Sequence, residues 1–301
     1  MSNPLNLEIQ GPQYISGTGS TTFEFSDTVT SCVFGFSKIN AEQEDSVEDM
    51  QDFTLQLWTN GANGSTVTVN QTVGGFVPDE TYSYVTCLAT VGSTPEGVTL
   101  ANSAKMPLGS SALVTSSIGG PPALCLGVLS GFGLQFTDDT DLDGIGAGVG
   151  VTMVPSGTPE IMLVGNGSLI GDEQAAASNT VSGGLICISA AALAAGGFNG
   201  TMVATAGQTN IWEWLLSNST PATPGLFLQS FYFQWPIAFG LGGGPWFQSI
   251  TAGGSNPTIS SGGLAVTAYL NGYVNYGERH SPNQQPATYQ TANYVCLAAA
   301  T

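Results

Sequence analysis

A short apolar segment built around a cysteine occurs three times along this chain, about one hundred residues apart. Residues 84–89 are Tyr-Val-Thr-Cys-Leu-Ala, residues 294–298 are Tyr-Val-Cys-Leu-Ala, and residues 185–190, Leu-Ile-Cys-Ile-Ser-Ala, form a looser copy. A period of this length indicates one structural unit used three times. The repeat therefore limits the fold, while it does not indicate an activity.

The residues before each copy have the pattern of β-strands. Phe53, Leu55 and Leu57 alternate with polar neighbours, and the Asn-Gly turn chemistry of residues 60–64 follows them. This alternation is typical of an antiparallel sheet with one buried face. Residues 149–153 and 246–250 take the equivalent place in the later copies. We expect these three segments to be equivalent strands.

The predicted fold class is all-β, with three related antiparallel units that are small sandwiches or barrels. Their predicted bounds are 1–92, 108–195 and 205–301, and the Gly/Pro-rich runs near 92–122 and 196–225 are the expected junctions. Three such units form either separate beads or a group packed around a pseudo-three-fold axis. The low charged content of 8% favours packing together.

Composition limits the partners of the chain. Lys38, Lys105 and Arg279 are its only basic residues, against 21 acidic ones, so the formal net charge is −18. This charge disfavours nucleic-acid binding and docking to anionic membranes, because both depend on Lys and Arg. Glu213 and Glu278 are the only acids beyond residue 190. We expect the nearly uncharged last third, residues 200–301, to carry the main contact with a partner or a second copy.

Targeting signals bear on where the protein is located. The first residues have neither a basic nor an apolar region of a Sec signal, and no apolar stretch is long enough to be a transmembrane segment. We expect synthesis in the cytosol, followed by a particle-associated or non-classical extracellular location.

The five cysteines are an odd number, so at least one is unpaired. Cys87, Cys187 and Cys296 lie at matching places inside apolar runs, and we expect them to be small buried core residues. The chain has no Cys-x-x-Cys pair, which argues against a structural zinc site.

The first unit resembles H-type lectins, which are small six-stranded β domains that assemble as trimers and bind sugars such as N-acetylgalactosamine. The resemblance covers about 70 residues: an opening Phe-x-Phe-Ser, residues 29–36, an acidic stretch, residues 53–57 and residues 82–89. The tryptophan common in that family's closing strand is absent, and Thr86-Cys-Leu-Ala occupies the place. The resemblance thus implies a shape and a class of ligand, while no sugar-binding residue is carried over.

Two groups of residues are candidate sites. Asp139, Asp141 and Asp143 alternate before Gly144, and alternate aspartates before a glycine can wrap oxygen ligands around Ca²⁺. A solvated acidic loop is the alternative interpretation. The second group mixes aromatic, amide and charged side chains that orient sugar hydroxyls, and a polar loop between strands is its alternative. Its members are Tyr273, Asn275, Tyr276, Arg279, His280 and Trp246.

Catalysis is not expected. His280 is the only histidine, and no Gly-x-Ser-x-Gly motif accompanies it. A glycosidase would need two opposed carboxyl groups, and the acids of residues 42–52 form a solvated loop more naturally. The sequence therefore predicts a non-catalytic, lectin-like protein that recognises carbohydrate or a cell surface. The alternative is a self-associating structural protein of a virion, filament or coat.

Overall fold

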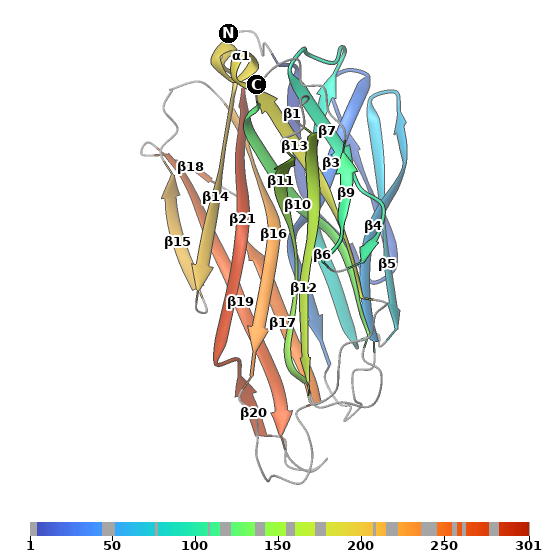
Figure 1. The fold of residues 1–301 in the computed structure, drawn as a ribbon, viewed down its shortest axis with the longest axis vertical. Helices are drawn as coiled ribbons and strands as arrows, with labels where there is room; N and C mark the ends of the chain where they lie inside the picture. Colours follow the sequence, from blue (N-terminus) through green and yellow to red (C-terminus); the bar gives the residue numbers. More distant parts are fainter. Residues whose placement is uncertain are drawn as a thin grey trace.

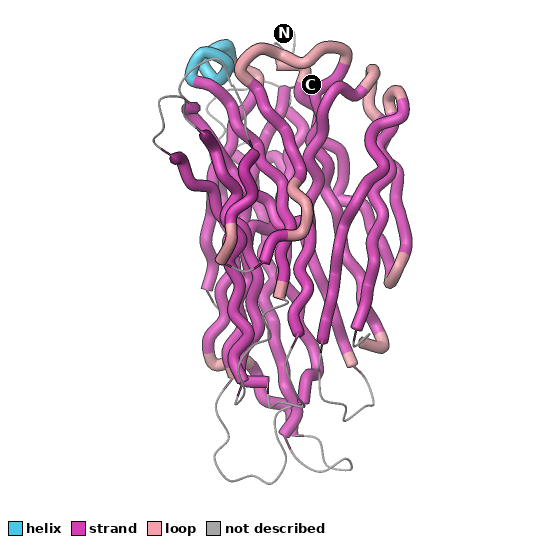
Figure 2. The backbone as a smooth tube through the Cα atoms, turned by 45° about the vertical axis from the view of Figure 1, so that its right-hand side comes forward, coloured by secondary structure: helices cyan, strands magenta, loops and turns pink. Residues whose placement is uncertain are grey.

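A computed structural model describes residues 5–43, 52–75, 78–107, 109–114, 122–135, 142–154, 160–171, 179–206, 209–214, 222–235, 246–254, 258–260, 263–276 and 283–300. The molecule is elongated, and its strands run along the long axis (Figures 1 and 2). One short helix, α1 (Ala190–Ala195), lies at the end of the molecule where both termini are found. The all-β prediction is confirmed, because the described residues form three antiparallel sheets.

Sheet A has eight strands from the first and last thirds of the chain. Its order is β1 (Leu7–Ser16), β6 (Glu80–Val91), β3 (Val29–Glu42), β17 (Trp246–Gly254), β19 (Gly263–Tyr276) and β15 (Thr209–Trp214), and β18 (Thr258–Ser260) and β20 (Asn283–Pro286) also pair with β19.

Sheet B has seven strands from the first and middle thirds. Its order is β2 (Gly19–Glu24), β5 (Thr66–Gly75), β4 (Asp52–Asn63), β10 (Pro122–Gln135), β13 (Thr180–Ser189) and β7 (Val98–Asn102), and β8 (Met106–Pro107) also pairs with β13.

Sheet C has six strands from the middle and last thirds. Its order is β14 (Phe198–Ala206), β21 (Tyr289–Ala300), β16 (Ala222–Gln234), β11 (Leu142–Val154), β12 (Glu160–Gly171) and β9 (Ser111–Val114).

Each sheet is therefore shared between two thirds of the chain. The joining pairs are β3 with β17, β10 with β4, and β16 with β11. The segments expected as junctions also contain strands, since β7 and β14 lie within them. The short alternation of Val98 and Leu100, both buried, forms β7 in spite of the surrounding glycine and proline.

The strands β3, β10 and β16 share an irregularity. Each pairs with its neighbour β6, β13 or β21, and in each pairing the register shifts by one residue part-way along the strand. The extra residues are Ser37, Ser130 and Gln229. A β-bulge of this kind bends the strand and increases its local twist. The three strands thus bend at comparable points.

Aromatic side chains connect the three sheets in a common core. The ring of Phe247 on β17 lies 6.5 Å from that of Phe53 on β4, which lies 5.5 Å from Phe132 on β10. Phe132 in turn lies 5.3 Å from Phe231 on β16, with the rings edge to face. All four residues are buried. Such pairs contribute about 1 kcal/mol each beyond the burial of their surface, so this chain of rings holds sheets A, B and C together.

The cysteines differ in part from expectation. Cys87 and Cys296 are buried, as predicted; both are free thiols, and they face Phe34 and Leu226 on the neighbouring strands. Cys187 is also buried in the core, as predicted, but the sequence did not indicate its partner: it faces Cys125 on β10 and forms a disulfide with it. The Cα atoms of this pair are only 4.2 Å apart, as directly opposed residues of adjacent strands can be.

Candidate functional site

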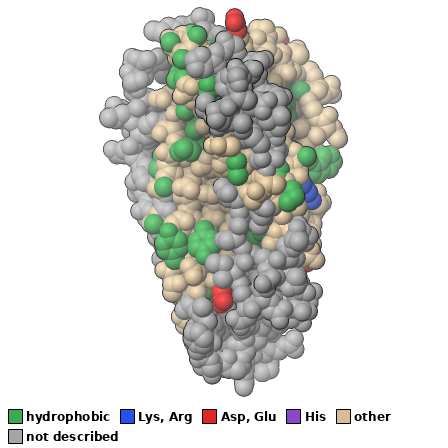
Figure 3. Space-filling model, in the orientation of Figure 1, with side chains coloured by type: hydrophobic (Ala, Val, Ile, Leu, Met, Phe, Trp, Pro, Cys, Tyr) green, Lys and Arg blue, Asp and Glu red, His purple; other side chains and the backbone are tan. Residues whose placement is uncertain are grey.

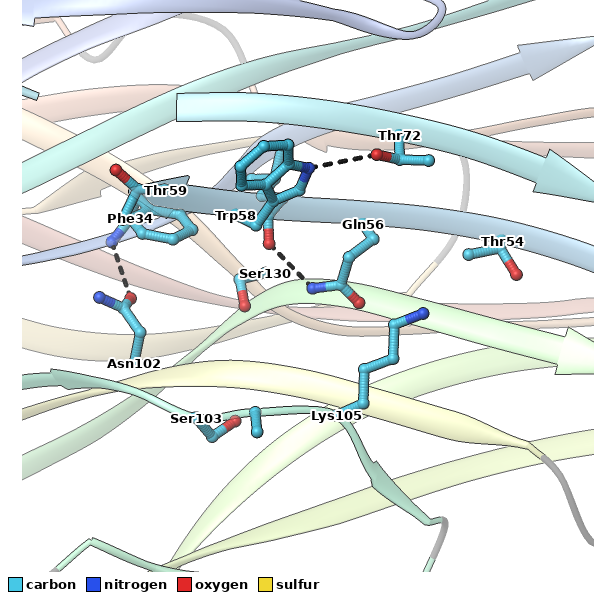
Figure 4. A pocket seen from close by; sticks show the side chains of 12 residues that line it. Phe34, Thr54, Gln56, Trp58, Thr59, Thr72, Asn102, Ser103, Lys105 and Ser130 are labelled. Carbon is cyan, nitrogen blue, oxygen red and sulfur yellow. Dashed lines mark hydrogen bonds between the residues drawn. The ribbon is translucent and has the colours of Figure 1, made fainter. Parts of the chain in front are cut away.

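The candidate site lies where two halves of sheet B separate. The pairing of β4 with β10 covers only Asp52–Gln56 and Gly131–Gln135. Beyond Gln56, β4 pairs with β5 alone, and the earlier part of β10 pairs with β13. The diverging strands leave an open cavity of about 450 Å³ between them (Figure 4).

The cavity is lined mainly by hydroxyl, amide and aromatic side chains. They come from β3, β4, β5, β10, the end of β7 and the segment that follows it. The lining residues are Phe34, Thr54, Gln56, Leu57, Trp58, Thr59, Thr72, Asn102, Ser103, Ala104, Lys105 and Ser130.

Trp58 presents its indole ring at the mouth of this cavity. Along β4 the side chains of Leu55 and Leu57 are buried, so the alternation of the strand turns Trp58 outward, and 43% of its surface is exposed. Its indole N–H donates a hydrogen bond to Oγ1 of Thr72 on β5, 3.2 Å away. This bond holds the ring by its edge on the exposed side of β4 (Figure 4).

Gln56 marks the point where β4 and β10 separate. Its Nε2 donates to Oγ of Ser182, 2.6 Å away on β13, and to the carbonyl of Leu57 at 2.8 Å. The facing residue is Gly131, and a Cβ there would lie 2.6 Å from the Gln56 carboxamide. A glycine is thus needed opposite Gln56, because any side chain would displace the amide from the site.

The end of β7 and the segment after it form the opposite wall. Asn102 Nδ2 donates to the carbonyl of Cys32 at 2.9 Å, and its Oδ1 accepts from the Phe34 N–H at 3.4 Å. Ser103 Oγ accepts from the Gly183 N–H at 3.0 Å. These bonds tie the wall to sheets A and B. The side chain of Lys105, one of three basic residues in the sequence, extends toward Gln56 (Figure 4).

The structure places the described members of the predicted ligand group elsewhere, on sheet A. Tyr273 is half-buried on β19, and the backbone of Trp246 on β17 pairs directly with that of Asn275. The segment expected to be a loop from residue 273 begins as strand, because residues 273–276 pair with β20. The side chains of Trp246, Asn275 and Tyr276, and all of Arg279 and His280, lie outside the described residues.

The predicted calcium site falls mostly outside the described residues as well. Asp143 is buried on β11, whereas Asp139 and Asp141 are not among the described residues. Within the described ranges, no group of three or more His, Cys, Asp or Glu side chains is placed to hold a metal ion. Calcium binding stays a prediction.

Large apolar side chains reach the surface in few places in the described part of the chain. Trp235, from the tryptophan-rich last third, is 1% exposed and stacks on Phe233 in the core. The exposed ones are Tyr14, Trp58, Met202, Tyr269 and Tyr289. The described part of the face in Figure 3 carries few charged side chains.

No described helix has the length and apolar character needed to cross a bilayer.

Trp58 was not among the predicted ligand residues, although the sequence contains a pattern that could have identified it. Trp58 occupies the polar face of an otherwise regular alternation, and a large aromatic side chain at such a position is exposed. Asn102, Ser103 and Lys105, which line the same cavity, had no such signal in the sequence, because only the pairing of β7 with β13 brings them near β4.

No family model matches the chain, and a search of curated proteins finds no match.

Proposed function

We propose that the protein is a carbohydrate-binding protein of lectin-like type, and that a short saccharide binds in the cavity beside Trp58. The half-exposed indole ring over an open, hydroxyl-rich cavity is the observation that carries this proposal. Sugars have apolar C–H faces that stack on aromatic rings, and hydroxyls that pair with amides and alcohols. Trp58 offers the first kind of contact, and the lining offers the second.

The dimensions and chemistry of the cavity support this ligand class. A volume of about 450 Å³ falls within the usual range for sites that bind small molecules. Thr54, Thr59 and Ser130 contribute hydroxyls, and Gln56 contributes an amide already fixed by its own hydrogen bonds. These groups bind sugar hydroxyls, whereas glycoside hydrolysis uses two carboxyl groups. Binding without catalysis is therefore the function that we propose.

A glycan array probed with the wild-type protein tests the proposal. We expect binding to a defined group of short glycans, including those that end in N-acetylgalactosamine if the H-type lectin resemblance extends to the ligand. Repeating the array with calcium and with a chelator tests the predicted calcium site separately. An array without binding at either calcium level would contradict the proposal.

We further infer that the chain consists of three related units arranged around a pseudo-three-fold axis. The cyclic joining of β3 to β17, β10 to β4 and β16 to β11 supports this inference, as does the bulge common to the first strand of each pair. The first third also forms six strands, the number that the H-type lectin resemblance implies.

A circular permutant tests the three-unit inference. The new chain begins at Pro95, between β6 and β7, and a short linker joins the natural ends, which lie at the same end of the molecule (Figure 1). Because this cut falls between units, we expect a folded protein with cooperative unfolding. A matched permutant that begins at Gly64, in the turn between β4 and β5, cuts within a unit and should be less stable. Equal stability of the two permutants would argue against the units.

A further inference from the structure

A row of aromatic side chains crosses the outer face of sheet A. Tyr14 on β1 pairs in register with Tyr84 on β6, which pairs with Lys38 on β3. Lys38 faces Gly253 on β17, and Gly253 faces Tyr269 on β19. The row thus spans five strands, a distance of about 19 Å at the usual strand spacing. Tyr14 and Tyr269, at its two ends, are 50% and 39% exposed.

Lys38 holds the row together. Its Nζ lies 5.9 Å from the ring centroid of Tyr84 and 5.5 Å from that of Tyr269, and it also lies 5.4 Å from the ring of Tyr82, two residues from Tyr84 on β6. Tyr269 reaches the ammonium group across β17 because Gly253 has no side chain between them. Cation–π contacts of this kind fix the orientation of the rings, so the row is ordered before any ligand arrives.

A polar row runs beside the aromatic one, two residues further along each strand. Its members, which pair with one another across the strands, are Ser16, Tyr82, Asn40, Thr251 and Asn271. Thr251 Oγ1 donates to Oδ1 of the buried Asn40 at 2.6 Å, which orients the half-buried Thr251 hydroxyl. A tyrosine phenol is neutral at physiological pH and donates a hydrogen bond; burial, followed by the charge of Glu80, raises the pKa of Tyr82 still further.

From this geometry we propose that the outer face of sheet A is a second carbohydrate site, which binds an extended neutral polysaccharide laid across the strands. Rings at intervals along the row stack on successive sugars, and the neighbouring hydroxyls and amides contact their hydroxyl groups. The ligand is neutral because Glu42 and Glu80 pair in the next row of this face and the whole chain has a net charge of −18, which repels a polyanion. This inference does not depend on the cavity at Trp58.

Native gel electrophoresis with soluble polysaccharide in the gel tests the proposal, because a chain of this charge migrates readily. Hydroxyethyl cellulose, galactomannan and soluble starch are the neutral probes, and alginate is the anionic one. We expect at least one neutral polysaccharide to retard the protein and alginate not to do so. Tyr14→Ala and Tyr269→Ala should each weaken the binding by roughly tenfold.

Two control variants test whether the polysaccharide binds at the aromatic row. One removes an exposed tyrosine on another sheet, and the other removes Trp58 at the cavity. Tyr289→Ala removes a tyrosine that is 53% exposed on β21 of sheet C, and it should keep full retardation. Trp58→Ala should also keep it while losing short glycans on the array, which distinguishes the two proposals. Absence of retardation by every neutral probe, or full retardation of Tyr14→Ala and Tyr269→Ala, overturns the inference. A change in the sedimentation of these two variants, with unchanged retardation, would identify the face as a contact between copies instead.

Discussion

The indole nitrogen of Trp58 lies 3.2 Å from the hydroxyl of Thr72, and this hydrogen bond joins β4 to β5 on the outer face of sheet B. It is the contact that fixes the plane of the exposed ring. A ring with a fixed plane loses less conformational freedom on binding than a mobile one, which favours affinity.

Replacing Thr72 by valine keeps the shape of the side chain and removes the acceptor. We expect Thr72→Val to weaken saccharide binding by about 0.5–1.5 kcal/mol, the cost of ordering a mobile side chain on binding, and to lower the free energy of unfolding by about 1 kcal/mol or less. Thr68→Val, at an exposed position on the same strand, is the matched control and should bind normally. Normal binding by Thr72→Val would show that the ring does not need this bond.

The aromatic core makes a separate prediction about stability. Phe132 is fully buried and contacts the rings of Phe53 and Phe231, so its loss leaves a cavity where sheets B and C meet. We expect Phe132→Ala to lower the free energy of unfolding by about 3–5 kcal/mol in urea titration. The surface variant Tyr289→Ala should change it by about 0.5 kcal/mol or less. A small effect of Phe132→Ala would mean that the sheets are held together elsewhere.

Gly253 allows β17 to approach β3 closely. A Cβ at this position would lie 2.2 Å from the Cα of Lys38, and the backbone φ is +154°. Because the clash involves backbone, we expect Gly253→Ala to destabilise the protein by about 1–3 kcal/mol. Gly74→Ala is the control, since the nearest atom to its added Cβ is 3.8 Å away. Thermal unfolding of both variants gives the comparison, and equal midpoints would contradict the close approach.

Buried thiols predict a loss of stability at high pH. Burial raises the pKa of Cys296 from 9.0 to about 12 in the folded chain. The stabilisation that results is complete below about pH 9 and is lost as the pH rises toward 12, because the unfolded chain releases the proton first. We expect urea titrations at pH 8 and pH 11 to show a smaller loss for Cys296→Ala than for the wild type. Identical losses would assign the effect to other groups.

The sequence predicted the local elements better than their assembly. The alternation of Phe53, Leu55 and Leu57 predicted β4 correctly, because burial on one face of a strand has a period of two residues. The burial of Cys87 and Cys296 also followed from their apolar surroundings. The pairing of Cys125 with Cys187 did not, since it depends on the register between β10 and β13, which neither strand specifies alone.

The candidate site depends even more on assembly. Trp58 and Lys105 lie on either side of one cavity only because β4 and β7 belong to the same sheet, with β10 and β13 between them. Likewise Lys38 and Tyr269, far apart in the sequence, share one row because β17 pairs with both β3 and β19. Such contacts are set by strand order, and strand order is a property of the packed molecule.

Calorimetric titration tests the central proposal most directly. A short glycan selected on the array is titrated into the wild type, Trp58→Ala and the surface control Tyr289→Ala, after unfolding curves have shown that all three are folded. Because the Trp58 side chain is 43% exposed, its removal should leave the fold intact and abolish the stacking surface. We predict unchanged affinity for Tyr289→Ala and a loss of tenfold or more for Trp58→Ala, about 1.4 kcal/mol at the least. Equal affinity of Trp58→Ala and the wild type would contradict binding at this cavity.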